Sequence, residues 1–125
     1  MYNINEDDGL SDNYVYDIAI TKEGFIKAAT DRGLNIISFS GEKKNIKIFS
    51  SKDGLPDNEV LKLYADSKGR VWMGTFSKEP SYFYKGKIYN RSNDSNLARI
   101  LFLSNIYSID EDLDGNIIIG DNKIL

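Results

Sequence analysis

Carboxylates are the side chains with which this chain could carry out acid, base or metal chemistry. The sequence holds 19 Asp and Glu but no His and no Cys. A Ser-His-Asp triad, a Cys-His nucleophile, a thiolate or imidazole zinc site and a haem ligand are therefore excluded within one chain. Asp31, Glu59 and Glu79 could supply the paired carboxylates of a glycosidase or lyase. No apolar setting that would raise the pKa of a carboxylate is evident, so we expect no catalytic residue and no cofactor.

A second group of carboxylates resembles a calcium-binding loop. Asp110, Asp112 and Asp114 alternate with other residues and are followed by Gly115, which is the spacing of such a loop. The final ligand position holds Asp121 instead of the usual Glu, and strand-like sequence flanks the stretch. The alternative is a hairpin turn with side chain to backbone bonds and Gly115 at positive φ. Calorimetric titration with calcium against magnesium distinguishes the two interpretations.

Composition excludes several classes of partner. The 16 Lys and Arg against 19 Asp and Glu give a net charge of −3 and a pI near 4.9, which argues against a nucleic-acid partner. No apolar run approaches the roughly 20 residues of a membrane helix, so we expect no membrane contact by this segment. Residues 1–8 are acidic and lack an apolar stretch, so we expect no export signal in the chain. The absence of Cys leaves the redox compartment undecided.

The elements that must position these residues follow from an internal repeat. Residues 8–15 read D-G-L-S-D-N-Y-V and residues 53–60 read D-G-L-P-D-N-E-V, which gives a period of 45 (53 − 8). A third copy follows at an offset of 46, placing Gly115 on Gly69 (115 − 69). We expect a single domain over residues 1–125 whose repeats cover about 8–52, 53–98 and 99–125.

Each repeat predicts a set of short strands, because β-branched and aromatic runs alternate with Gly, Asp, Asn and Ser turns. A repeat of about 45 residues with four strands has the size of a propeller blade. The middle strands are apolar on both sides, as expected where both faces pack on neighbouring blades. The predicted fold class is all-β, a partial propeller of about three blades built as four-stranded antiparallel meanders. The predicted strands are 15–20, 25–30, 34–39, 44–50, 60–66, 70–75, 82–85, 87–90, 105–110, 116–120 and a stub at 123–125.

The second repeat resembles a known family. Residues 54–75 read G-L-P-D-N-E-V-L-K-L-Y-A-D-S-K-G-R-V-W-M-G-T, which is similar to the two-component regulator propeller repeat. The first copy departs from the pattern with Lys27 at the tryptophan position and Ala29 at the glycine, and the third has Ile118 at the tryptophan position. The resemblance implies the extracytoplasmic, periplasmic sensor region of a hybrid histidine kinase, often one that responds to carbohydrate, with the kinase elsewhere in a parent protein.

The number of repeats also bears on assembly. The chain holds fewer than three full blades, whereas propellers typically close with about four to eight. Residues 1–7 are predicted to form an outer strand that completes another blade, since residues 2–6 align with residues 47–51 at the repeat offset. Exposed sheet edges favour pairing. We therefore expect either a homodimer that closes a six-blade ring or a chain that is part of a larger propeller.

Loops of the predicted meanders give a candidate ligand-binding face. The loops that enter each first strand and those that join second to third strands emerge on one face, near the central axis. Mixed aromatic, acidic and basic groups on a rigid scaffold suit a polar or sugar ligand. An ordinary hydrated loop surface is the alternative. The residues on this face are Tyr14, Asp31, Arg32, Glu59, Phe76, Lys78, Glu79, Arg99 and Asn105.

Three further residues have two interpretations each. Asn13 and Asn58 precede the first strands of their repeats, where they either bond to nearby backbone and fix the loop or contact a ligand. Trp72 is either wedged between blades or forms a sugar-stacking platform.

The sequence thus favours a non-catalytic binding module, a sensor propeller fragment that recognises a ligand such as an oligosaccharide. The alternatives are a carbohydrate-active propeller enzyme and a purely structural or protein-binding piece. Sugar turnover would indicate the enzyme. Saturable binding without turnover would indicate the sensor. The absence of both turnover and binding would indicate the structural piece.

Overall fold

The described residues form three antiparallel sheets that follow one another along the chain. The computed structural model describes residues 3–77, 79–100 and 106–121. The first sheet has the order β1-β2-β3-β4, the second β5-β6-β7-β8, and the third contains β9 and β10 in the described ranges. The strands are β1 Val15–Ile20, β2 Ile26–Thr30, β3 Gly33–Ser40, β4 Lys43–Phe49, β5 Val60–Ala65, β6 Val71–Thr75, β7 Ser81–Tyr84, β8 Lys87–Tyr89, β9 Ile106–Glu111 and β10 Ile117–Asp121. This is the predicted all-β architecture of propeller-type blades. The predicted stub at 123–125 lies outside the described residues.

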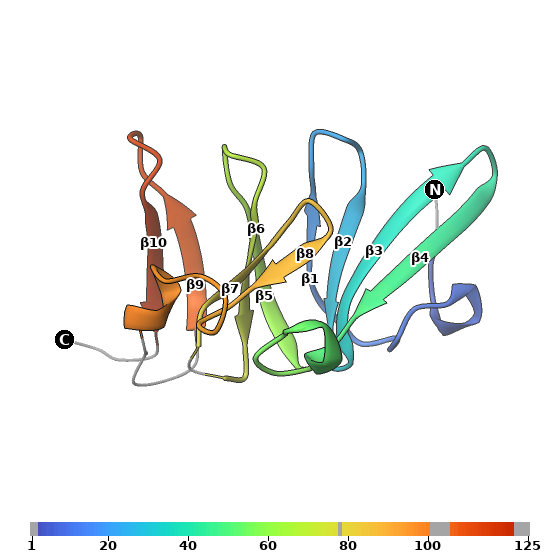
Figure 1. Ribbon diagram of the computed structural model, residues 1–125. Coiled ribbons are helices and arrows are strands. Elements are labelled where there is room, and N and C mark those ends of the chain that lie inside the picture. The colour runs from blue at the N-terminus through green and yellow to red at the C-terminus, as the bar shows by residue number, and fades with distance from the viewer. Residues whose placement is uncertain (1–2, 78, 101–105, 122–125) are drawn as a thin grey trace.

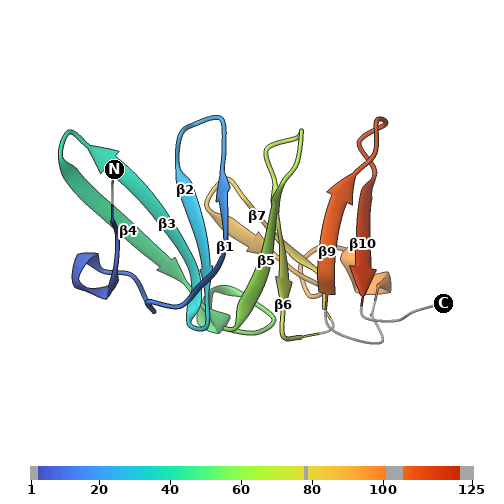
Figure 2. The same ribbon diagram turned by 180° about the vertical axis from the view of Figure 1, so that it is seen from behind.

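The sheets stand side by side, as Figures 1 and 2 show from opposite sides. β1 contacts β5, and β5 contacts β9, so the first strands of successive sheets are neighbours. One hydrogen bond crosses the first boundary, from the backbone N–H of Leu63 to Oδ2 of Asp17 at 2.9 Å. The first strand of each sheet therefore lies innermost, as expected for blades arranged around an axis.

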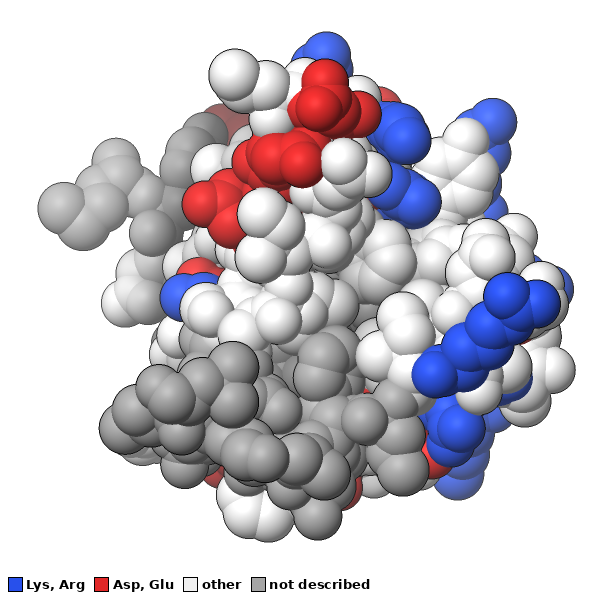
Figure 3. Space-filling model, turned by 90° about the vertical axis from the view of Figure 1, so that its left-hand side faces the viewer, with Lys and Arg blue, Asp and Glu red and all other residues white. Residues whose placement is uncertain are grey.

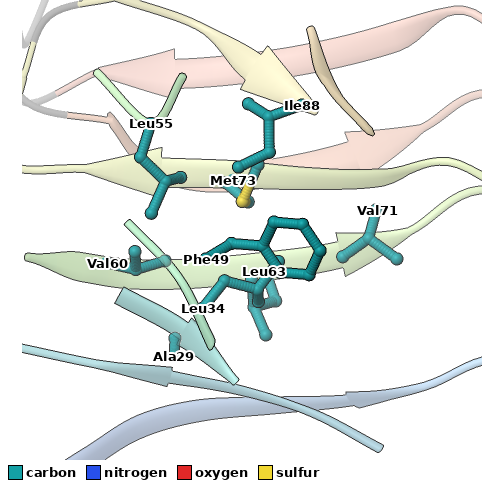
Figure 4. Close-up of a cluster of buried hydrophobic side chains, with 9 residues drawn as sticks. All are labelled: Ala29, Leu34, Phe49, Leu55, Val60, Leu63, Val71, Met73 and Ile88. Atoms are coloured by element: carbon teal, nitrogen blue, oxygen red, sulfur yellow. The ribbon is translucent and has the colours of Figure 1, made fainter. Parts of the chain in front are cut away.

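The main core fills the space between the first two sheets (Figure 4). Side chains from β2, β3 and β4 meet side chains from β5, β6 and β8, and the segment between the sheets contributes one leucine. Burial of this apolar surface is the main favourable term that joins the two blades. The buried residues are Ala29, Leu34, Phe49, Leu55, Val60, Leu63, Val71, Met73 and Ile88.

Trp72 anchors the second boundary, between the sheets β5–β8 and β9–β10. It is 6% exposed and clusters with Leu97 and Ile109. Its indole Nε1 donates to Oδ2 of Asp66 at 2.9 Å, and Asp66 also pairs with Arg70 at 2.6 Å. The prediction that Trp72 is wedged between blades is therefore confirmed, and a sugar-stacking role for it is excluded by its burial.

Short 3-10 turns precede the blades. Glu6–Asp8 (η1) and Ser51–Asp53 (η2) both have capping boxes and end at a glycine with φ of 109°. Leu97–Arg99 (η3) occupies the same place in the third repeat, although the sequence motif is lost there. Glu6 and Asp7 thus lie in a turn, and residues 3–5 are in no strand. The outer strand predicted for residues 1–7, which would complete another blade, stays a prediction.

The asparagines ahead of the first strands fix these turns. Asn13 Oδ1 accepts from the backbone N–H of Glu6 at 2.7 Å, and Asn58 Oδ1 accepts from that of Ser51, also at 2.7 Å. The bonds are identical in two repeats, so the loop-fixing interpretation of these residues is confirmed. The structure assigns both side chains to the architecture.

One face of the first sheet has no blade against it among the described residues. Ile18 and Ile20 of β1 are 59% and 66% exposed, although they sit beside Ala28 and Ile26 in the sheet. Leu63, the repeat equivalent of Ile18 (18 + 45), is 6% exposed because the first sheet covers it. The same apolar pattern is thus covered in one blade and uncovered in the other.

Candidate functional site

A β-bulge in the innermost strand of the first sheet shapes the candidate site. The pairing of β1 with β2 joins Val15 to Thr30 and Asp17 to Ala29, so Tyr16 is an extra, unpaired residue. A bulge redirects the side chain of the residue it inserts and is common beside functional sites. The Tyr16 side chain is 40% exposed and reaches the loop between β2 and β3.

Two tyrosines and a carboxylate meet at this end of the first sheet. The rings of Tyr14 and Tyr16 lie with their centroids 4.8 Å apart. The Tyr16 hydroxyl donates to Oδ1 of Asp31 at 2.7 Å. This hydrogen bond raises the pKa of Tyr16 from 10.0 to about 12. Tyr14 is 63% exposed, so one face of the pair is open to solvent.

The second blade adds a carboxylate and an aromatic ring to the group. Desolvation of Glu59, and then its hydrogen bond with Asp31, raise the pKa of Glu59 above its usual value. The backbone N–H of Phe76 donates to the carbonyl oxygen of Glu59 at 3.0 Å, which places Phe76 beside it. Phe76 is 57% exposed. These residues form one group across two blades, which we refer to as the loop cluster. It consists of Tyr14, Tyr16, Asp31, Glu59 and Phe76.

Buried polar groups hold the loop that carries Asp31. Asn35 is fully buried, and its side chain bonds both to the backbone N–H and to the hydroxyl of Ser11, at 2.9 and 2.7 Å. Thr30 Oγ1 accepts from the backbone N–H of Arg32 at 3.0 Å. Satisfied buried networks of this kind rigidify their surroundings. The scaffold therefore presents the loop cluster in a fixed arrangement.

The other predicted site residues lie around or apart from the loop cluster. Arg32 forms an ion pair with Asp12, at 3.6 Å, beside the Tyr14 backbone. Glu79 pairs with Arg91 at 3.7 Å, and Arg99 is exposed at the end of η3. Within the described ranges, no hydrogen bond or ring contact joins Glu79 or Arg99 to the loop cluster. Lys78 and Asn105 lie outside the described residues.

Two features of the site were not predicted from the sequence: the position of Tyr16 and the raised pKa of Glu59. The role of Tyr16 in the site was not predicted, because a bulge depends on the register of two paired strands and is not indicated by any residue type. The sequence showed no apolar setting that would raise the pKa of a carboxylate, but in the structure desolvation, and then Asp31 from the neighbouring blade, raise the pKa of Glu59. The pairing of two blades, and not the local sequence, creates this contact.

In the acidic turn between β9 and β10, the Asp112 carboxylate is hydrogen-bonded by other residues of the same turn. Asp112 Oδ1 accepts from the backbone N–H groups of Asp114 and Asn116, and its Oδ2 accepts from the Asn116 amide. Gly115 has φ of 85°, as the hairpin interpretation predicts. Figure 3 shows acidic side chains gathered at the end of the molecule that carries this turn. No group of three possible metal ligands occurs among the described residues. Calcium binding by Asp110, Asp112 and Asp114 remains an untested prediction.

The hydrogen bond between Tyr16 and Asp31 gives a measurable titration. We expect Asp31→Asn to lower the pKa of Tyr16 from about 12 toward 10. The folded state binds this proton more tightly than the unfolded state, so the stabilisation is present below pH 10 and is lost as the pH rises toward about 12. Absorbance titration of tyrosinate measures the change, and Tyr16→Phe identifies the step. An unchanged step in Asp31→Asn would contradict the contact.

Comparison with known proteins agrees with this architecture. Residues 54–77 match the family model described as two component regulator propeller, so the second repeat has the sequence of that family's repeat. Among solved structures, the extracellular domain of a protein described as a hybrid two component system from B. thetaiotaomicron matches with a TM-score of 0.69 and 22% identity. The match covers 94% of this chain and 16% of that one, so this chain spans less than a fifth of that structure.

No curated protein matches the chain. In the part of the chain that the structure describes, no helix is long and apolar enough to cross a membrane.

Proposed function

We propose that this chain is a non-catalytic, ligand-binding part of a sensor propeller and that the loop cluster binds a neutral oligosaccharide. The observation that carries the proposal is the loop cluster itself, with exposed aromatic rings beside carboxylates held by rigid loops. Sugars present apolar faces that stack on aromatic rings and hydroxyls that donate to carboxylates. The family match of the second repeat and the similarity to an extracellular domain support a sensor role in an extracytoplasmic, periplasmic setting.

Charge favours a neutral sugar over an acidic one. Carboxylates are bonded to the residues of the loop cluster. Asp12 accepts from the backbone N–H of Tyr14, and Asp57 accepts from that of Glu59. Asp31 accepts from the Tyr16 hydroxyl, and Arg32 pairs with Asp12 at 3.6 Å. A uronic acid or sulfated sugar would meet like charges at short range, which is unfavourable. The hydroxyls of a neutral sugar can donate to the same oxygens without that penalty.

One carboxylate of the loop cluster is already engaged by the protein. Asp31 accepts from the Tyr16 hydroxyl at 2.7 Å, and the pKa of Glu59 is raised first by desolvation and then by Asp31. Glycosidases need two carboxyl groups with a sugar or a water between them. We therefore expect Asp31 and Glu59 to contribute to binding and not to hydrolysis.

We also propose that the uncovered face of the first sheet packs against a further blade of the same repeat type, supplied by a second copy of the chain. Ile18 and Ile20 repeat positions that a blade covers at the boundary of the second sheet. Exposed apolar surface in this pattern favours association. A closed ring of blades would place several loop clusters around one axis.

Substitution of two phenylalanines, one inside and one outside the loop cluster, tests the proposed binding site. We expect Phe76→Ala to weaken binding of a neutral oligosaccharide about threefold to tenfold, because it removes one stacking ring. Phe39→Ala is the control, since Phe39 is also exposed but lies at the far end of β3, away from the loop cluster. Isothermal titration with maltohexaose, cellohexaose, xylohexaose and mannohexaose, with hexagalacturonate as the acidic comparison, measures the effect.

The outcomes of this titration separate the candidate functions. Saturable binding of a neutral hexasaccharide that weakens in Phe76→Ala alone supports the proposal. Equal loss in both variants, or preferential binding of hexagalacturonate, contradicts it. Release of shorter sugars during the titration would indicate the enzyme, and no binding by any sugar would indicate a scaffold.

A further inference from the structure

A cavity lies between the first two blades at the end opposite to the loop cluster. It has a volume of about 470 Å³ and opens between the β1–β2 turn, the β5–β6 turn and the β7–β8 turn. Its floor contains Ile36, Phe49, Val71 and Phe83. Small-molecule sites in proteins have volumes of about 300 to 1,000 Å³ and are mostly apolar, so the size and floor suit a ligand.

The cavity exists because one blade departs from the repeat. In the second sheet, strand pairing places Trp72, Tyr82 and Tyr89 in one row across β6, β7 and β8. Their rings contact one another with centroids 4.7 and 5.0 Å apart. This aromatic row fills the space on that side of the second blade.

The equivalent row of the first sheet is different. Lys27, Ile36 and Lys47 are paired across β2, β3 and β4, and they face the second blade. Two aromatic rings and an indole are thus replaced by an isoleucine and two lysines. The smaller and flexible side chains leave the cavity open and bring positive charge into its wall.

Lys27 is the buried charge of this cavity. The residue is 3% exposed, and its Nζ donates one hydrogen bond, to Thr21 Oγ1 at 2.9 Å. The same Nζ lies 5.5 Å from the centre of the Phe25 ring. An ammonium has three N–H donors, so its capacity is not filled by these contacts. Burial lowers the pKa of Lys27, and Glu23 partly opposes this effect.

Three more lysines surround the opening. Lys47, Lys68 and Lys85 line the cavity and are exposed, whereas Glu23 is its one acidic lining residue. The ion pairs of the described residues involve none of the lining lysines. Glu23 compensates the Lys27 charge only in part and forms no ion pair with it. An anion placed beside Lys27 would reduce the cost of burying this charge.

We propose that this inter-blade cavity binds an anionic ligand with an apolar body, a carboxylate or sulfonate whose charged group meets Lys27 and whose body packs on the apolar floor. The site is separate from the loop cluster and uses residues of both blades. A ligand there would also tie the first blade to the second.

A pair of fluorescent compounds tests the proposal. Anilinonaphthalene sulfonate has an aromatic body and one negative charge, and phenylnaphthylamine has the same body without the charge. We expect the sulfonate to bind at one saturable site and Lys27→Met to weaken that binding about tenfold, because a charge-assisted hydrogen bond is lost. Binding of the neutral compound should remain or strengthen, since methionine is apolar.

Two further lysine variants distinguish a specific effect of Lys27 from a general loss of charge or of folding. Lys43→Met removes an exposed lysine of β4 that does not line the cavity, and it should leave both affinities unchanged. If Lys27→Met does not fold, as circular dichroism would show, Lys47→Met is the replacement and should weaken sulfonate binding alone. Equal binding of the sulfonate by the parent protein and the lysine variant would overturn the proposal and place the compound on the uncovered face of the first sheet. Oligosaccharide binding at the loop cluster should be unaffected in every variant.

Discussion

Replacing Asp66 with alanine is expected to lower the free energy of unfolding by about 3 kcal/mol, because a buried and fully hydrogen-bonded carboxylate is lost. The Asp66 side chain is fully buried and accepts from the backbone N–H groups of Lys68 and Arg70, from Arg70 Nε and from Trp72 Nε1. Its removal leaves the indole and part of the guanidinium without partners. Urea unfolding followed by circular dichroism measures the loss.

Thr21→Ala is the matched control for this variant. Thr21 is the repeat equivalent of Asp66 (21 + 45) but accepts one side-chain hydrogen bond, from Lys27. We expect a loss of about 1 kcal/mol there. Equal losses of unfolding free energy in the two variants would contradict the stabilisation of Trp72 and Arg70 by Asp66 at the boundary between the second and third sheets.

The same carboxylate gives a dependence on pH. Burial acts to raise the pKa of Asp66, but hydrogen bonds from Arg70, Trp72 and Lys68 outweigh it and hold the pKa below 3.8. A lowered pKa in the folded state means that this stabilisation is present above pH 3.8 and is lost as the pH falls through the folded-state value. The difference in stability between the parent protein and Asp66→Ala should therefore shrink in strong acid.

A second large effect is expected where the repeats are equivalent but their environments are not. Leu63→Ala should lower the free energy of unfolding by about 3 kcal/mol, since a large-to-small change in a core leaves a cavity. Ile18→Ala should cost less than about 1 kcal/mol in the monomer, because Ile18 is 59% exposed. Chemical unfolding at low protein concentration compares the two variants.

Association should depend on the uncovered face that carries Ile18. Sedimentation velocity over a wide concentration range is expected to show a dimer of the parent protein and a monomer of Ile18→Asp, which places a charge on the uncovered face. A monomer at every concentration of the parent protein would contradict assembly through a second copy. Equal stability losses for Leu63→Ala and Ile18→Ala in the monomer would contradict the described packing of the first sheet.

Much of the fold could be predicted because the chain repeats itself. β1 was predicted with its observed bounds, and β2 begins at Ile26, one residue after the predicted start. The capped 3-10 turns were not predicted, although Asn5 and Asp8 are the residues of a capping box. Repeat spacing predicts the order of the strands. The turns recur at the same spacing, since Asp8 and Gly9 return as Asp53 and Gly54, but this recurrence was interpreted only as part of the repeat and not as a capped turn.

The candidate site could be predicted only in part. Meander topology brings Tyr14 and Asp31 to one face, which the sequence indicates. The bulge at Tyr16 and the approach of Asp31 to Glu59 depend on strand register and on the packing of two blades. The inter-blade cavity was missed for the same reason, since the substitution Lys27 was visible but its row with Ile36 and Lys47 was not.

The most direct test of the proposed function is an NMR titration of the isotopically labelled protein with the neutral hexasaccharides. We expect saturable shifts of the backbone amides of Tyr14, Glu59 and Phe76, and no comparable shifts at the β1–β2 and β5–β6 turns. These amides lie at the loop cluster, and the turns lie at the opposite end of the blades. Shifts confined to the opposite end, or no shifts with any of the four sugars, would contradict the proposal that the loop cluster binds a neutral oligosaccharide.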